Sequence, residues 1–383
     1  MRIGFDVSQT GRLKAGCGYF ADSLIRHLAE IDAENEYLLY PTFGDFYWDP
    51  DWPTGICRID RPNFKCWHGH KSLEEGRQFW SEPTEDLEAQ MGNVQVLHSN
   101  NFFCPTTLRN TRLIYTLYDL GFVEHPEWTT EENRIGCFTG VFNASLYADY
   151  IVAISEYSRQ NFLQTFPHYP SDRIIVVYPA SRFTGISSLD RPEEITDLQP
   201  GRYWLSVCTL EPRKNQRRLV KAYARLKAEL SQTLPLVLAG GQGWMMEDFK
   251  DFINGLGLGE NVILLGYVNE TTLQWLYQNC FAFLYPSLFE GFGLPVLEAM
   301  SLGALVICSN ATSLPEIVDE AGVLVNPEED PFLEAMVKLF KGEICRTDLK
   351  AKALKRANDF SWAAAAQKVL EIYREAISKG VSA

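Results

Sequence analysis

One stretch in the second half of the chain, residues 281–300, joins a short apolar run, a glycine-rich turn and a helical segment. The apolar run 281–285 predicts a buried strand of a parallel sheet, because such strands are covered on both faces. Gly291 and Gly293 allow the backbone to approach a ligand closely, and Pro295 suits the first turn of a helix, where its missing N–H is not needed. We therefore expect a strand, a loop and a helix.

Two carboxylates flank the start of this helix. The backbone amides of Phe292, Gly293 and Leu294 would lie at the helix N-terminus, which suits an anion such as a diphosphate. Glu290 and Glu298 can accept hydrogen bonds from hydroxyl groups. A sugar nucleotide has both kinds of group. An ordinary helix start with incidental acids is the alternative, because two glutamates eight residues apart are usually solvated side chains.

The frame around these glutamates resembles the signature of the retaining glycosyltransferases of family four (glycosyl transferases group 1), whose fold is GT-B. It consists of Pro286-Ser287, Glu290-Gly291-Phe292-Gly293 and Leu294-Pro295. The resemblance implies an α/β fold of two facing Rossmann-like domains with a cleft between them. It also implies that Glu290 contacts the donor sugar, that Glu298 holds the ribose hydroxyls, and that the amides of Phe292, Gly293 and Leu294 contact sugar and phosphate.

The length and composition favour two globular domains. The chain has 383 residues, of which 46% are hydrophobic, and short apolar strands alternate with amphipathic helices in both halves. The loop-like residues 181–200 predict the boundary. We assign residues 1–182 to an acceptor-binding domain and residues 183–360 to a nucleotide-sugar-binding domain. The family resemblance implies that the terminal helix within 361–383 crosses back to the first domain.

The net charge of −14 argues against a nucleic-acid partner, because phosphate backbones are bound through clustered Lys and Arg. No segment reaches the ~18 uninterrupted apolar residues of a membrane span, and the first residues predict a strand and not a secretory leader. We therefore expect a cytoplasmic protein, with a peripheral contact to the inner face of the membrane as a further possibility.

The nine cysteines are scattered, which predicts reduced thiols and no disulfide framework. Cys57, Cys66, His68 and His70 are close in sequence but lack the paired spacing of zinc sites. We expect no bound metal.

Two cations follow the predicted strand 203–207, at the switch from strand to helix. Arg213-Lys214-Asn215 resembles the family's Arg-Lys-Asn element, which implies that Arg213 and Lys214 neutralise the leaving diphosphate. A surface pair at a helix start is the alternative. Further along, Tyr267 and Val268 follow another strand and in the family lie against the nucleobase.

The first half carries looser matches. Gly16-Cys17-Gly18-Tyr19 resembles the family's N-terminal glycine loop, which implies that the amides near Gly16 and Gly18 approach the donor phosphates or the acceptor; a simple turn is the alternative. Asp119 ends a predicted strand where the family usually has a His-Asp pair on the acceptor side, but Tyr118 stands in the place of the histidine. Asp119 as a loop cap is the alternative. His98, at the end of another strand, is a candidate acceptor contact.

The segment 47–80 shifts to Trp, Pro, His and Asp with little periodicity, which predicts a long irregular loop. Its aromatic side chains are candidates for stacking on an acceptor sugar or a lipid carrier, with simple packing of the loop as the alternative. They are Trp48, Trp52, Trp67 and Trp80.

We therefore expect a retaining, metal-independent hexosyltransferase without a cofactor, acting through Glu290, Asp119, Arg213 and Lys214. Its acceptor would be a saccharide or lipid-linked saccharide in cell-surface polysaccharide biosynthesis. UDP-glucose is the preferred donor, because Glu270, the only acid near the expected base site, falls in a probable helix cap; GDP-mannose is the runner-up. A sugar-nucleotide epimerase or hydrolase on the same fold is the alternative enzyme, and a binding protein without catalysis is the alternative outside enzymes. The oligomeric state stays open.

Overall fold

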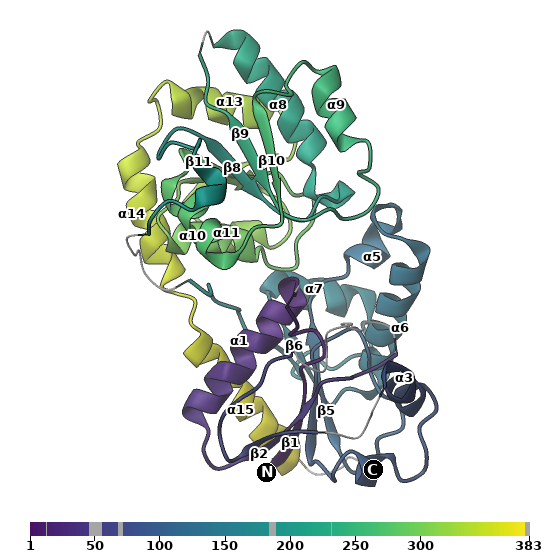
Figure 1. The fold of residues 1–383 in the computed structure, drawn as a ribbon. Coiled ribbons are helices and arrows are strands. Elements are labelled where there is room, and N and C mark those ends of the chain that lie inside the picture. Colours follow the sequence, from purple (N-terminus) through teal and green to yellow (C-terminus); the bar gives the residue numbers. More distant parts are fainter. Residues whose placement is uncertain (13, 46–55, 68–71, 184–188, 231, 380–383) are drawn as a thin grey trace. The chain divides into compact units, whose positions relative to one another are not determined.

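The computed structural model describes residues 1–12, 14–45, 56–67, 72–183, 189–230 and 232–379 (Figure 1). The chain forms two compact units, Met1–Pro179 with Ser361–Ala383, and Ala180–Phe360. Each unit has its own parallel sheet, so the prediction of two Rossmann-like α/β domains is confirmed. The division falls at residue 179 and not at 182, which places Arg182 in the second unit.

The sheet of the first unit has seven parallel strands in the order β3-β2-β1-β4-β5-β6-β7. Its first strand in sequence, β1, lies inside the sheet with Ile3 and Phe5 completely buried, and Ile3 pairs with Tyr37 on one side and Val96 on the other. The strands are β1 (Arg2–Asp6), β2 (Glu36–Tyr40), β3 (Phe64–Cys66), β4 (Val96–Ser99), β5 (Arg112–Leu117), β6 (Tyr150–Ala153) and β7 (Ile174–Val176).

Helices surround this sheet, and several begin at side-chain caps. Ser155 accepts a hydrogen bond from Ser158 N at the start of α7, and Thr130 accepts one from Asn133 N at the start of α6. The elements are α1 (Gly16–Ile31), α3 (Leu73–Ser81), α4 (Leu87–Gln90), α5 (Gly121–Glu124), η1 (Pro126–Trp128), α6 (Glu131–Tyr147), α7 (Glu156–Thr165) and α15 (Trp362–Ser378).

The terminal helix α15 lies beside α1 in the first unit (Figure 1). The ring of Trp362 meets the ring of Phe20 edge-on at 5.7 Å. The hydroxyl of Tyr373 lies 2.5 Å from Nδ1 of His98 on β4. The predicted return of the chain to its first domain is therefore confirmed.

The segment 47–80 was expected to be irregular, but its described part contains β3 and α3. Ser72 caps α3 by accepting a hydrogen bond from Glu75 N at 3.1 Å. Trp80 is buried against Phe43, with ring centroids 4.5 Å apart. Four residues of interest in this segment lie outside the described residues: Trp48, Trp52, His68 and His70.

The second unit has six parallel strands in the order β10-β9-β8-β11-β12-β13. In both sheets the order reverses beside the first strand, between β1 and β4 and between β8 and β11. Open α/β sheets bind ligands at such switch points, outside the carboxyl ends of the strands. The strands are β8 (Trp204–Val207), β9 (Leu236–Ala239), β10 (Val262–Gly266), β11 (Ala282–Tyr285), β12 (Val306–Ser309) and β13 (Val323–Val325).

The helices of the second unit alternate with its strands. They are η2 (Glu193–Ile195), η3 (Pro212–Lys214), α8 (Gln216–Glu229), α9 (Phe249–Gly255), α10 (Glu270–Asn279), α11 (Leu294–Ser301), α12 (Leu314–Val318), α13 (Glu329–Phe340) and α14 (Arg346–Ala357). Across the described parts of both units, no helix has the length and apolar character needed to cross a membrane.

Candidate functional site

Two loops meet at the switch point of the second unit, one following β8 and the other following β11. The amide of Leu288 donates to the carbonyl of Arg213 at 2.8 Å, and the hydroxyl of Ser287 donates to the same carbonyl at 3.2 Å. Asn215 has a φ of 61° and donates through its side chain to the carbonyl of Pro286 at 3.0 Å. These bonds fix the cation-bearing loop against the glutamate-bearing loop.

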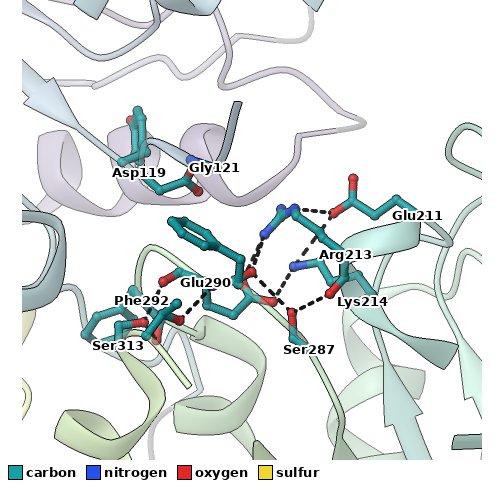
Figure 2. Close-up of polar contacts among 12 residues, drawn as sticks. Asp119, Gly121, Glu211, Arg213, Lys214, Ser287, Glu290, Phe292 and Ser313 are labelled. Atoms are coloured by element: carbon teal, nitrogen blue, oxygen red, sulfur yellow. Dashed lines mark hydrogen bonds and ion pairs between the residues drawn. The ribbon is translucent and has the colours of Figure 1, made fainter. Parts of the chain in front are cut away.

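Glu290 accepts contacts from both predicted cations (Figure 2). Lys214 Nζ lies 2.6 Å from Oε1 of Glu290, and Arg213 Nη1 lies 3.3 Å from Oε2. The hydroxyl of Tyr285, the last residue of β11, donates to Oε1 at 2.8 Å. Glu211 adds a second carboxylate, whose Oε1 is 2.8 Å from Arg213 Nε and 3.8 Å from Lys214 Nζ. Two cations and two carboxylates thus form one compact cluster.

The cluster keeps Glu290 ionised although its side chain is only 8% exposed. Burial alone would raise the pKa of this carboxyl, but the charges of Lys214 and Arg213 outweigh burial and lower the pKa to about 2. Arg213 is more accessible than Lys214, with 27% of its side chain exposed against 10%. An incoming anion therefore reaches Arg213 more easily.

The start of α11 is fixed by a neighbouring turn. The hydroxyl of Ser313 donates to the carbonyls of Glu290 and Phe292 at 2.9 and 2.8 Å, and Glu290 N donates to Thr312 Oγ1 at 3.0 Å. Gly293, the N-cap, has a φ of 108°, and a Cβ there would lie 2.6 Å from Leu314 Cδ2. The phenyl ring of Phe292 is buried. Phe292, Gly293 and Leu294 therefore bring backbone groups to the helix start beside Glu290.

Glu298, one turn inside α11, lies in a second set of contacts. Its Oε1 is 2.9 Å from Arg182 Nε, and its Oε2 accepts from the hydroxyl of Tyr277 at 3.3 Å. Arg182 also lies 3.2 Å from Glu270. Burial raises the pKa of Glu298, and Arg182 and Tyr277 oppose this effect without cancelling it.

The carboxyl end of β10 carries the residues expected near a nucleobase. Gly266 has a φ of 68°, and its carbonyl accepts a hydrogen bond from Gly240 N at 2.7 Å. Tyr267 is 56% exposed, and Val268 follows it before α10. Glu270 is the first residue of α10, whose N-cap is Asn269.

In the first unit, Gly16 and Gly18 lie in the first turn of α1 and not in a loop before it. A Cβ on Gly18 would lie 2.0 Å from the carbonyl oxygen of Gln9, so a glycine is needed for this close approach. The expected glycine loop is therefore corrected to a helix N-terminus.

Asp119 follows β5 and accepts a hydrogen bond from Gly121 N at 3.0 Å, at the start of α5 (Figure 2). Tyr118, which replaces the family's histidine, is buried. Its hydroxyl donates to the carbonyls of Asn100 and Cys17 at 2.8 and 3.3 Å. Tyr118 thus ties β5 to the first turn of α1.

The expectation that His98 contacts an acceptor is wrong. Its side chain is completely buried, and Nε2 lies 2.9 Å from Thr116 Oγ1 while Nδ1 contacts Tyr373 of α15. Burial lowers the pKa of His98 to about 3, so the imidazole is neutral. This histidine belongs to the core under α15.

Sequence reasoning missed several partners in the second unit. Glu211 lies two residues before Arg213, and Tyr285 directly precedes the motif that contains Glu290. This closeness in sequence could have identified both residues as members of the site. Arg182 carried no signal, because it lies in a loop far from Glu298 in sequence.

Comparison with known proteins assigns this chain to a family. The family described as glycosyl transferases group 1 matches residues 192–356. The chain is 34% identical over 287 residues to the O-antigen chain mannosyltransferase B of Escherichia coli, covering 73% of this chain and 74% of that protein.

A second relative comes from Campylobacter jejuni. It is named N-acetylgalactosamine-N,N'-diacetylbacillosaminyl-diphospho-undecaprenol 4-alpha-N-acetylgalactosaminyltransferase, and it is 29% identical over 219 residues, 56% of each chain. Among solved structures, HepE of Anabaena in complex with UDP-glucose matches with a TM-score of 0.74 at 18% identity, over 98% of this chain and all of that one. This likeness shows the fold.

Proposed function

The chain belongs to the glycosyl transferases group 1 family, and from that premise we propose that it is a retaining hexosyltransferase of polysaccharide biosynthesis. It would move the sugar of a nucleotide donor to a saccharide or lipid-linked saccharide. The observation that carries the proposal is the meeting of Arg213, Lys214 and Glu290 at the switch point of the second unit.

The residues of this cluster suit complementary roles. The ionised Glu290 can accept hydrogen bonds from donor sugar hydroxyls and hold the sugar in a reactive position. Arg213 and Lys214, with the amides at the start of α11, can stabilise the charge that develops on the leaving diphosphate. In our proposal a phosphate oxygen assists the incoming hydroxyl on the face that the diphosphate leaves, which retains the configuration. Asp119 is assigned to the acceptor side.

Metal independence forms part of this proposal, because two cations and a helix N-terminus supply the positive charge. Transfer should continue in EDTA at the rate seen without it. Complete loss on chelation with recovery on adding manganese would contradict this part of the proposal alone.

For the donor we now place GDP-mannose before UDP-glucose. The E. coli relative is named a mannosyltransferase, and its resemblance covers 73% of this chain. One observation supports UDP-glucose. Glu270, the acid nearest the expected base site in sequence, begins α10 and is paired with Arg182. No guanine-binding role is therefore indicated for Glu270.

Parallel assays separate these donors. UDP-glucose, UDP-galactose, dTDP-rhamnose and GDP-mannose should be incubated with the enzyme, with and without saccharide acceptors, and both hydrolysis and transfer measured. We expect transfer from GDP-mannose. Transfer from UDP-glucose alone would make UDP-glucose the preferred donor. Donor turnover that does not depend on any added acceptor would favour the hydrolase or epimerase.

We further propose that the enzyme is cytoplasmic and contacts the membrane through α6. This helix exposes Phe138, Phe142 and Leu146 along one side, and the Campylobacter relative is named for a diphospho-undecaprenol acceptor. Replacing Phe138 and Phe142 with Ser should abolish co-flotation with phosphatidylcholine vesicles. Equal flotation of wild type and variant would contradict the contact.

A further inference from the structure

A cavity of about 780 Å³ lies within the first unit, and Asp119 is not among the described residues that line it. Its walls are the first half of α6, the loop after β4 and the end of α3. The volume falls in the range of about 300–1,000 Å³ typical of small-ligand pockets. Its aromatic residues are Trp80, Phe102 and Phe103.

Hydrogen bonds and close packing hold these aromatic walls in place. Trp80 Nε1 donates to the carbonyl of Thr42 at 3.0 Å, and the hydroxyl of Ser99 donates to the carbonyl of Phe103 at 2.6 Å. Gly140 of α6 lies so close to the loop that a Cβ there would be 1.4 Å from the carbonyl oxygen of Phe102. The cavity is therefore formed before any ligand arrives.

The charged residues that line the cavity are all acidic. They are Asp45, Glu131 and Glu132, and within the described parts of the chain no Lys, Arg or His lines it. An anion such as a phosphate would find repulsion and no cationic partner there. A neutral sugar suits the same surroundings, because its hydroxyls can donate to carboxylates while its C–H faces cover aromatic rings.

One wall residue of the cavity, Phe102, packs near the sequence neighbour of the residue assigned to the acceptor side. The ring of Phe102 lies 5.9 Å from the ring of Tyr118, the neighbour of Asp119 in sequence. A ligand against Phe102 is thus separated by two aromatic side chains from the strand end that carries Asp119.

We propose that this cavity binds uncharged sugar residues of the acceptor, and that any diphosphate or lipid part of the acceptor lies outside it. The inference rests on the proposed glycosyltransferase function and adds to it a second binding site with its chemical class.

The test measures saccharide binding to the full-length protein by saturation-transfer NMR and calorimetry, with mannobiose and chitobiose as neutral probes and mannose 6-phosphate as the anionic probe. Thr139→Trp, on the cavity side of α6, fills the space. Thr165→Trp, the same change at an exposed position in the last turn of α7, is the matched control. Tm and nucleoside diphosphate affinity report whether each variant is folded.

We expect at least one neutral disaccharide to bind, and Thr139→Trp to weaken it by about tenfold or more. Thr165→Trp should keep the wild-type affinity, and mannose 6-phosphate should bind more weakly than mannobiose. Unchanged affinity in a folded Thr139→Trp variant, stronger binding of the phosphate, or no binding of either disaccharide would overturn the proposal.

The two proposals fail separately. If the cavity is not an acceptor site, wild type still transfers sugar, and Thr139→Trp leaves the acceptor KM unchanged. If the chain is not a transferase, no sugar is transferred from any donor. The NMR and calorimetry measurements still show whether the cavity binds a saccharide.

Discussion

At the residue scale, the candidate site depends on a buried carboxylate whose charge is maintained by two cations of another loop. Lys214 contacts Glu290 across 76 positions of sequence, at 2.6 Å. Removing one partner of such a cluster leaves the other charges uncompensated, which costs more than the net stabilisation that the pair provides. Function and stability are therefore coupled at this position.

Glu290→Gln should reduce kcat by about a hundredfold, because the donor sugar loses an ionised acceptor that positions it. It should also destabilise the second unit, since Lys214 and Arg213 then share only Glu211. Glu334→Gln on α13, where an exposed glutamate pairs with Lys338, is the control and should change neither quantity. A Glu290→Gln enzyme with wild-type turnover would contradict the assigned role.

The contribution of Glu290 to stability should depend on pH. The pKa of Glu290 in the folded protein, about 2, is below its ordinary value of 4.5, so its ionised form contributes stability above pH 4.5 that is lost as pH falls toward 2. The difference in Tm between wild type and Glu290→Gln should therefore shrink over this interval. A constant difference down to pH 2 would contradict the lowered pKa.

Arg213→Ala and Lys214→Ala should each weaken nucleoside diphosphate binding by about 1.5–3 kcal/mol, the value of a charge-assisted hydrogen bond. Calorimetry with GDP and UDP measures the effect. Arg217→Ala, on α8 beside exposed Asp248, removes a nearby positive charge outside the cluster and serves as the control. Equal affinities in all three variants would refute the diphosphate role.

At the element scale, the start of α11 depends on a backbone conformation that side chains disfavour. Gly293 combines a φ of 108° with close contact to Leu314 of α12. The turn at Thr312 and Ser313 then fixes the preceding loop. The helix start and the position of Glu290 are thus determined together.

Gly293→Ala should destabilise the protein by about 1–3 kcal/mol and lower donor affinity, because both the strained φ and the clash with Leu314 move the loop. Gly255→Ala is the matched control: it lies at the end of α9 with a negative φ and open space around its Cβ position. Chemical unfolding and donor titration measure the two effects. Equal stability of both variants would contradict the argument.

At the scale of the whole molecule, the chain leaves the first unit at residue 179 and returns to it at residue 361. The buried side chains of α15 are part of the core of the first unit, with Val369 completely buried and Tyr373 in contact with His98. The first unit is therefore complete only when the end of the chain has packed.

Val369→Asp should destabilise the first unit by more than about 3 kcal/mol, because it buries an unpaired charge. Nucleoside diphosphate binding, which our proposal assigns to the second unit, should persist. Gln367→Asp, on the exposed side of the same helix, should cost less than about 0.5 kcal/mol. Loss of nucleotide binding together with the first unit would show that the two units unfold as one.

Local patterns in the sequence were sufficient to predict individual strands and helices and the family. Short apolar runs and helical periodicity depend on neighbouring residues, so β11 and the helix with Pro295 in its first turn were predictable, as was the terminal helix. The motif around Glu290 predicted the family that the comparisons confirm.

Which distant side chains meet depends on how the elements pack against one another. The same strand pattern that predicted β4 gave no indication that His98 faces α15, because the two segments are joined only by packing. The pairing of Arg182 with Glu298 and the walls of the cavity at Trp80 and Gly140 likewise arise from contacts between separate elements. Local preferences act over a few residues, whereas burial and charge pairing depend on the packing of the whole domain.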